Sequence, residues 1–257
     1  MFKKNKSNKM KNLLYIFLLI SQISLAQTAF DQGNKYYEKE NYEAAISSFE
    51  SVVNSGKQSA ELYFNLGNSY YKLHKVAPAI YNYEKALLLS PNDTEIKTNL
   101  EFARKMAIDD IKVIPKVGFN KLLSDFTSKY YYDTWAWIAV SFAFLFLVFF
   151  VGYYFSQKTI LKRIFFIGMF LWLVGILLSA ASGYYEKSRN DNERPAIVFA
   201  ENAPLKSEPK ATGQDAAVLH EGTKVFIIES IANWKKVELT DETTGWIEDS
   251  SIKEIKN

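Results

Sequence analysis

Residues 62–71 read LYFNLGNSYY, and this stretch decides how the N-terminal part of the chain folds. Its glycine and the first of its paired tyrosines have counterparts earlier in the chain, and a later alanine and aromatic residue have counterparts at the same spacing. The matching pairs are Gly33/Gly67, Tyr36/Tyr70, Ala45/Ala79 and Phe49/Tyr83. The two members of each pair lie about 34 residues apart. A fixed period of this length is typical of proteins that stack one small structural unit on the next.

This period, of about 34 residues, is the spacing of tetratricopeptide repeats, in which each unit is a pair of helices. Glycine lets the two helices of a unit touch, tyrosine fills the gap between them, and the small alanine admits the neighbouring helix. The second copy is the fuller match because Leu66, Ala86 and Pro91 are also in place. The first copy has Lys57 where proline is usual. Residues 27–112 are therefore predicted to form an all-α repeat domain.

A third helix is predicted over about residues 94–108, where Leu100 keeps the register of the repeat. Glu101 and Arg104 replace its glycine and tyrosine, which indicates a cap that solvates the end of the stack. Two repeats with a cap are fewer than the three usually needed for independent stability. Docking on the membrane or self-association is therefore expected to stabilise the domain.

The first helices of such repeats line a concave surface that binds extended partners. The residues predicted to line this groove are Asn34, Tyr37, Phe64, Asn65, Asn68, Tyr71 and Lys72. Asn34 and Asn65 resemble part of the carboxylate clamp by which some of these repeats hold a chain terminus. However, Phe30 and Glu95 stand where that clamp needs lysine. An aromatic and amide groove for a peptide or a helix is therefore favoured, with plain packing between repeats as the alternative.

Two windows without any charged residue lie in the middle of the chain, between Asp133 and Lys158 and between Arg163 and Glu186. Each window is long enough to cross the roughly 30 Å of hydrocarbon in a bilayer. The predicted transmembrane helices are residues 134–157 and 164–185. The loop at residues 158–163 carries three positive charges and no acid, so the positive-inside rule places it in the cytoplasm.

The segments that flank the two spans are predicted to be linkers outside the cytoplasm, at residues 113–133 and 186–194. The first linker is amphipathic, with Leu122, Leu123 and Phe126 at helical spacing. This pattern favours a helix that lies in the membrane interface. A solvent-exposed linker is the alternative.

The N-terminus has the layout of a secretory signal peptide. Lysines precede a short apolar run, and Ser24-Leu25-Ala26 supplies the small residues that signal peptidase requires. Residues 1–26 are therefore predicted to be removed after Ala26, with an uncleaved anchor as the alternative. Both possibilities place the following residues outside the cytoplasm.

From Pro195 onward, helical spacing gives way to short alternating segments separated by turn residues, which is typical of β-strands. The predicted strands are residues 196–200, 224–229, 234–239, 244–248 and 252–255. The stretches LHEGTKV (219–225), NWKKV (233–237) and GWI (245–247) are similar to bacterial SH3-like domains. In such small barrels, glycines supply the tight turns and tryptophans fill or flank the core. Residues 195–257 are therefore expected to form an all-β SH3-like barrel, with Trp234 and Trp246 on its surface.

Composition and charge exclude several classes of function. The chain has no cysteine, which excludes disulfides, thiolate metal sites and a cysteine nucleophile. Its net charge of +3 comes from cations that flank the apolar runs, so no basic face remains for nucleic acid. His74 and His220 have no ligand cluster at metal-binding spacing and are expected to be solvated. No catalytic residue, metal site or cofactor is predicted, and the chain is expected not to be an enzyme.

The order of signal peptide, tetratricopeptide repeats, two transmembrane helices and SH3-like domain resembles the BatE-type proteins of the aerotolerance (Bat) operon. The stretches that carry this likeness are residues 62–71, 99–105 and 245–247. The resemblance implies a scaffold for an oxidative-stress or envelope-integrity complex, with membrane proteins that carry von Willebrand factor A domains as partners. The predicted topology is that of a bacterial inner-membrane protein whose folded domains face the periplasm. The alternative function is peptidoglycan binding through the SH3-like domain.

Overall fold

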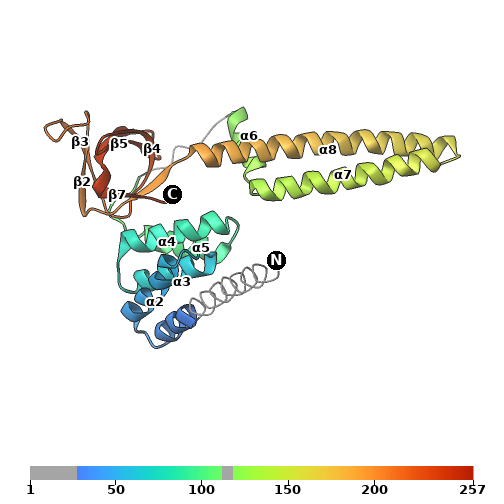
Figure 1. Cartoon of the computed structure of the whole chain (residues 1–257). Helices are drawn as coiled ribbons and strands as arrows, with labels where there is room; N and C mark the ends of the chain where they lie inside the picture. The colour runs from blue at the N-terminus through green and yellow to red at the C-terminus, as the bar shows by residue number, and fades with distance from the viewer. Residues whose placement is uncertain (1–27, 112–117, 257) are drawn as a thin grey trace, which may run out of the picture. The chain divides into compact units, whose positions relative to one another are not determined.

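The computed structural model describes residues 28–111 and 118–256, which divide into two compact units (Figure 1). The repeat–sheet unit joins the N-terminal helices to the C-terminal sheet. The hairpin unit contains the helices that lie between them in sequence. The predicted signal peptide at residues 1–26 lies outside the described residues.

The N-terminal helices follow one another as the repeat period predicts. Residues 28–38 are helical, and they are followed by α2 (Tyr42–Asn54), α3 (Ala60–Lys72), α4 (Val76–Leu89) and α5 (Thr94–Arg104). Side-chain oxygens of Asn41, Ser59 and Asp93 accept hydrogen bonds from free backbone N–H groups at the starts of α2, α3 and α5. These caps fix where the three helices begin. The turn after the first helix of each repeat is left-handed at Glu40 (φ 57°) and at His74 (φ 56°).

Two glycines allow the helices of each repeat to approach closely, as the sequence predicted. A methyl group on Gly33 would lie 2.5 Å from the ring of Phe49, and one on Gly67 would lie 2.8 Å from the ring of Tyr83. Both rings are fully buried. The same glycine–ring contact therefore builds both repeats, because any side chain at these glycines would push the two helices apart.

The C-terminal residues form one antiparallel sheet of seven strands in the order β3-β2-β6-β5-β4-β1-β7. The strands are β1 (Pro195–Val198), β2 (Asn202–Lys206), β3 (Asp215–His220), β4 (Lys224–Ile231), β5 (Trp234–Glu238), β6 (Thr244–Glu248) and β7 (Ile252–Glu254). Buried apolar side chains from all seven strands pack into one cluster, and the sheet curls around it (Figure 1). The described pairings run in one open order from β3 to β7, so closure into a barrel stays a prediction.

Strands β2 and β3 were not predicted from the sequence. β2 contains Pro204, which cannot donate a hydrogen bond to a neighbouring strand and argues against a strand in a sequence pattern. The structure pairs Pro204 with Val218 of β3, which lies at the edge of the sheet. Only Ala203 and Leu205 of β2 point into the core.

The sheet covers the outer side of the second repeat. Ile197 of β1 and Ile255, just after β7, belong to the same buried apolar cluster as Ile80 of α4 and Leu100 of α5. The backbone at Gly222 also approaches α4 so closely that a methyl group there would lie 3.0 Å from Ile80. Two repeats with a cap therefore gain an apolar partner within the same chain.

The hairpin unit is formed by α6 (Phe119–Thr127), α7 (Tyr132–Phe155) and α8 (Thr159–Asn192). α7 and α8 run antiparallel along each other, joined by a short turn (Figure 1). Gly168 and Gly175 of α8 receive the rings of Phe149 and Phe142 from α7. Most apolar side chains of the pair are exposed. By length and composition both helices could cross a membrane, with mean hydropathies of 2.3 and 2.5, which suggests membrane association.

α8 is longer than the predicted span. It extends from Thr159 to Asn192, whereas the sequence placed a loop at residues 158–163 and a linker at residues 186–194. The charged residues at both ends do not break the helix, and no proline occurs between Thr159 and Pro195. The hydrophobic pattern locates the apolar span, whereas the helix extends beyond it at both ends.

α6 packs on α8 through a buried polar cluster. Thr127 Oγ1 donates to Glu186 Oε1 at 2.5 Å, and Arg189 Nη2 donates to Glu186 Oε2 at 2.6 Å. Trp135 Nε1 donates to the carbonyl oxygen of Thr127 at 2.8 Å. The predicted amphipathic linker at residues 113–133 is thus helical from Phe119 to Thr127, and the end of this helix is held to both long helices.

Candidate functional site

Asparagine side chains link the first helices of successive repeats. Asn65 Nδ2 on α3 donates to Asn34 Oδ1 on the helix of residues 28–38 at 2.9 Å. Asn99 Nδ2 on α5 donates to Asn68 Oδ1 on α3, also at 2.9 Å. The second pair lies one repeat period after the first, so the repeat produces the same amide contact twice. All four side chains are half-buried.

Aromatic rings lie beside these amides. Tyr83 OH donates to Asn68 Oδ1 at 2.7 Å, and the ring of Phe64 lies 6.0 Å from that of Tyr83. Burial raises the pKa of Tyr83, and the nearby phenols of Tyr37 and Tyr71 raise it further. Burial likewise raises the pKa of Tyr37, so Tyr83 and Tyr37 are protonated at neutral pH and can donate hydrogen bonds.

This helical arrangement agrees with comparisons to known families. A tetratricopeptide repeat model matches residues 60–93, and a TPR repeat model matches residues 33–74. Residues 33–93 are tetratricopeptide repeats. A search of curated proteins gives no significant match to the chain. Because tetratricopeptide repeats present a concave surface to other polypeptides, protein–protein interaction is the function that these residues support.

Six of the seven predicted groove residues come together on the tetratricopeptide repeats, at Asn34, Tyr37, Phe64, Asn65, Asn68 and Tyr71. Lys72, the last residue of α3, is exposed and lies outside this bonded set. Two contributors were not predicted, Asn99 and Tyr83. Asn99 could have been found by moving Asn65 forward by one repeat period.

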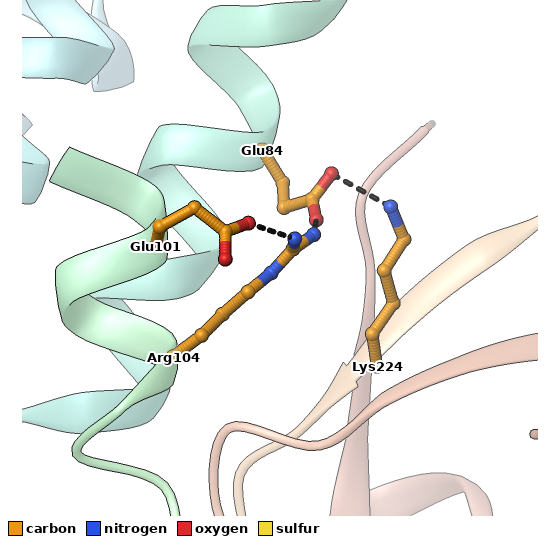
Figure 2. Close-up of polar contacts among 4 residues, drawn as sticks. All are labelled: Glu84, Glu101, Arg104 and Lys224. Carbon is orange, nitrogen blue, oxygen red and sulfur yellow. Dashed lines mark hydrogen bonds and ion pairs between the residues drawn. The ribbon is translucent and has the colours of Figure 1, made fainter. Parts of the chain in front are cut away.

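A buried acid joins the second tetratricopeptide repeat to the sheet (Figure 2). Glu84 of α4 accepts a hydrogen bond from Arg104 Nη2 of α5 at 2.7 Å and from Lys224 Nζ of β4 at 2.8 Å. Arg104 Nη1 also donates to Glu101 at 2.7 Å. Burial favours the neutral acid, but Lys224 and Arg104 outweigh that effect and hold the pKa of Glu84 below its ordinary value.

A second polar contact attaches the segment after α5 to the sheet. Asp109 accepts hydrogen bonds from the backbone N–H of His220 at 2.7 Å and from Thr223 Oγ1 at 2.6 Å. His220 Nδ1 also lies 2.7 Å from Asp109 Oδ1. Burial opposes ionisation of Asp109, yet these donors lower its pKa. His220 was expected to be a solvated surface residue, but it is half-buried and its ring contacts the carboxylate of Asp109.

The two tryptophans predicted on the surface of the sheet have different environments. Trp234 is half-buried and pairs with Glu248 across β5 and β6. Trp246 is only 8% exposed, so its prediction as a surface residue is wrong. β6 lies between β5 and β2, and both neighbours pair with Trp246.

Proposed function

We propose that this protein is a membrane-anchored, non-catalytic scaffold that assembles a protein complex in the bacterial envelope. The repeat groove binds a polypeptide of a membrane partner, and the BatE-like architecture favours partners with von Willebrand factor A domains. The complex would then act in aerotolerance or the oxidative-stress response. The sheet is an SH3-like domain whose seven strands close around their common core.

Free amide donors in the groove support this proposal. In the part of the chain that the structure describes, Oδ1 of Asn34 and Oδ1 of Asn68 accept hydrogen bonds, while Nδ2 of each has no acceptor. Extended peptides and helix ends present carbonyl oxygens that need such donors. Two donors one repeat apart, beside protonated tyrosines, suit a polypeptide that runs along the groove.

The connectivity of the chain supports the proposed topology. The segments before and after the hairpin unit belong to one compact unit, so they must lie on the same side of a membrane that α7 and α8 cross. Lys158, Lys162 and Arg163 gather at the opposite end of the hairpin, where the positive-inside rule favours the cytoplasm. The repeat–sheet unit then faces the periplasm.

The test is affinity capture of the full-length protein in mild detergent, followed by mass spectrometry. The Asn34→Asp/Asn68→Asp variant keeps both acceptor oxygens, and so keeps the internal hydrogen bonds, but removes the two free donors. Asn92→Asp, in the exposed turn before α5, is the control for added negative charge. We expect membrane proteins to be captured by the wild type and by Asn92→Asp, and to be lost with the double variant.

Equal capture by all three proteins would contradict the groove proposal. Recovery of cell-wall fragments alone, unaffected by the groove variant, would favour the alternative in which the sheet binds peptidoglycan. Because Trp246 is buried, Trp234 is the tryptophan to change in that case.

A further inference from the structure

A pocket of about 400 Å³ lies where α3 and α4 meet the sheet, away from the asparagine pairs of the groove. Its lining includes Tyr63 of α3, Tyr81 and Lys85 of α4, Phe199 after β1, and Lys253 of β7. Nothing in the proposed scaffold function uses these residues. The lining supplies two ammonium groups, the four aromatic rings of Tyr63, Tyr70, Tyr81 and Phe199, and one buried hydroxyl that has no partner among the described residues.

Both lysines are held over rings rather than against carboxylates. Lys85 Nζ lies 5.4 Å from the ring centres of Tyr63 and Tyr81. Lys253 Nζ lies 4.5 Å from the centre of the same Tyr81 ring and 5.7 Å from that of Phe199. Among the residues that the structure describes, no carboxylate forms an ion pair with either lysine. Cation–π contacts are therefore the contacts that the described residues provide to these two ammonium groups.

The two ammonium groups also repel each other. Burial lowers the pKa of Lys85, and the nearby charge of Lys253 lowers it further. Like charges near each other disfavour the charged form of each, and an anion bound near both would relieve this repulsion. The free protein is thus arranged to gain electrostatic energy when a negative group binds.

A hydroxyl completes the set of donors. Tyr63 is 3% exposed, and its OH has no hydrogen-bond partner in the described chain. Burial raises the pKa of Tyr63, so its phenol is protonated at neutral pH and available to donate. A buried hydroxyl without a partner is costly, and an acceptor on a ligand would remove that cost.

The acid in the pocket does not neutralise the lysines. Glu50 also lines the cavity, but its Oε1 accepts a hydrogen bond of 2.5 Å from Tyr70 OH. No ion pair joins Glu50 to a lysine in the part of the chain that the structure covers. The lining therefore carries two cations against one acid, whose carboxylate accepts a hydrogen bond from a phenol.

We propose that this pocket binds an oxyanion, a carboxylate or phosphate group of a small ligand, between Lys85 and Lys253 with the OH of Tyr63 as a third donor. The aromatic rings of Tyr81 and Phe199 bound the site and favour a ligand with an apolar portion beside its anionic group. Since the pocket includes residues from both the repeat and the sheet, a bound ligand stabilises their junction. The proposal does not depend on the groove or on its partners.

The experiment measures the thermal unfolding midpoint of the full-length protein in detergent against increasing inorganic phosphate, and separately against acetate, with chloride keeping the ionic strength constant. Lys85→Met and Lys253→Met each remove one ammonium group of the pocket. Lys105→Met is the matched control, because Lys105 lies 5.5 Å over the ring of Phe102 outside the pocket. Tyr63→Phe removes only the hydroxyl and keeps the packing.

We expect a saturable rise of the midpoint with phosphate, with acetate or with both, in the wild type and in Lys105→Met. Each pocket lysine variant should weaken the apparent affinity by about tenfold, the effect of losing one hydrogen bond to a charged group. Tyr63→Phe should weaken binding while its midpoint without anion stays equal or rises. The anion that gives the rise identifies the ligand class, phosphate or carboxylate.

No saturable rise with either anion would overturn the proposal. Equal affinities in Lys85→Met and Lys105→Met would also overturn it, since the rise would then be a general salt effect. If a lysine variant fails to fold, the conservative Tyr63→Phe variant decides the question, and unchanged binding in that protein contradicts the site.

Discussion

Glu84 is the residue on which the repeat and the sheet converge, because its carboxylate is buried and touches cations from both. Its side chain is 9% exposed, whereas that of Arg104 is 42% exposed. A buried acid that loses a cation remains charged in a poorly solvated place, which costs more than the loss of a surface ion pair. Lys224 is therefore the partner whose removal should matter most.

We expect Lys224→Met to lower the free energy of unfolding by about 2 kcal/mol, since it leaves Glu84 with only Arg104. The control is Lys236→Met, because Lys236 lies on the neighbouring strand β5 and has no ion pair in the described chain. This control should change the free energy of unfolding by less than about 0.5 kcal/mol. Urea unfolding of the full-length protein in detergent measures the free energy of unfolding of both variants. Equal effects would show that the junction does not depend on this ion pair.

The lowered pKa values of Glu84 and Asp109 predict acid sensitivity of the repeat–sheet junction. Each carboxyl binds its proton less readily in the folded chain than in the unfolded chain. Their stabilisation is therefore complete above the unfolded values, about 4, and is lost as the pH falls through the folded values. Unfolding midpoints recorded from pH 6 to pH 3 should fall less steeply in Glu84→Gln than in the wild type. Parallel curves would contradict this assignment.

At this scale the sequence allowed only part of the site to be predicted. The asparagines of the groove follow from the repeat period, and Asn99 could have been added by the same reasoning. The contact of Asp109 with His220 could not have been predicted, because the two residues are 111 positions apart and no periodic pattern relates them. Such long-range polar pairs depend on how the sheet docks, which the sequence pattern does not specify.

At the scale of the secondary-structure element, the close packing of α7 on α8 depends on small residues. Gly168 faces Phe149 so closely that an added methyl group would lie 2.2 Å from the ring. Alanine is otherwise the better helix former by about 1 kcal/mol. The sign of the stability change caused by Gly168→Ala therefore shows whether packing or helix propensity dominates.

We predict that Gly168→Ala destabilises the hairpin by about 1–3 kcal/mol through overpacking. The control is Ala180→Val, which adds bulk on an exposed position of the same helix and should have little effect. The measurement is thermal unfolding in detergent followed by tryptophan fluorescence, to which Trp135, Trp137 and Trp172 of the hairpin contribute together with the two tryptophans of the sheet. A gain in stability for Gly168→Ala would mean that the two helices are not packed as described.

Periodicity predicted the helices better than the strands. The tetratricopeptide helices and the apolar spans have strong patterns, and the structure has a helix at each of them. β2 and β3 were missed because Pro204 and a run of small residues obscure the alternation in each strand. The two ends of α8 were misjudged because hydropathy identifies the apolar span but not where a helix ends.

At the scale of the whole molecule, the absence of cysteine makes topology directly testable. Single cysteines at Asn92, in the repeats, and at Gln157, in the turn between α7 and α8, can be labelled in intact cells with a membrane-impermeant maleimide. With the outer membrane permeabilised, we expect Asn92→Cys to react at once and Gln157→Cys to react only after lysis. The reverse pattern would place the repeat–sheet unit in the cytoplasm and exclude the proposed periplasmic scaffold.

The repeat–sheet unit is assembled from the two ends of the chain, with the hairpin unit between them in sequence. During synthesis, the face of α4 that Ile197 and Ile255 cover therefore stays uncovered until the hairpin and the sheet have been made. This interval is on the order of ten seconds. The newly made repeats carry an uncovered apolar surface throughout that interval. We expect this surface to be the part of the nascent chain that a chaperone shields until the sheet has been made.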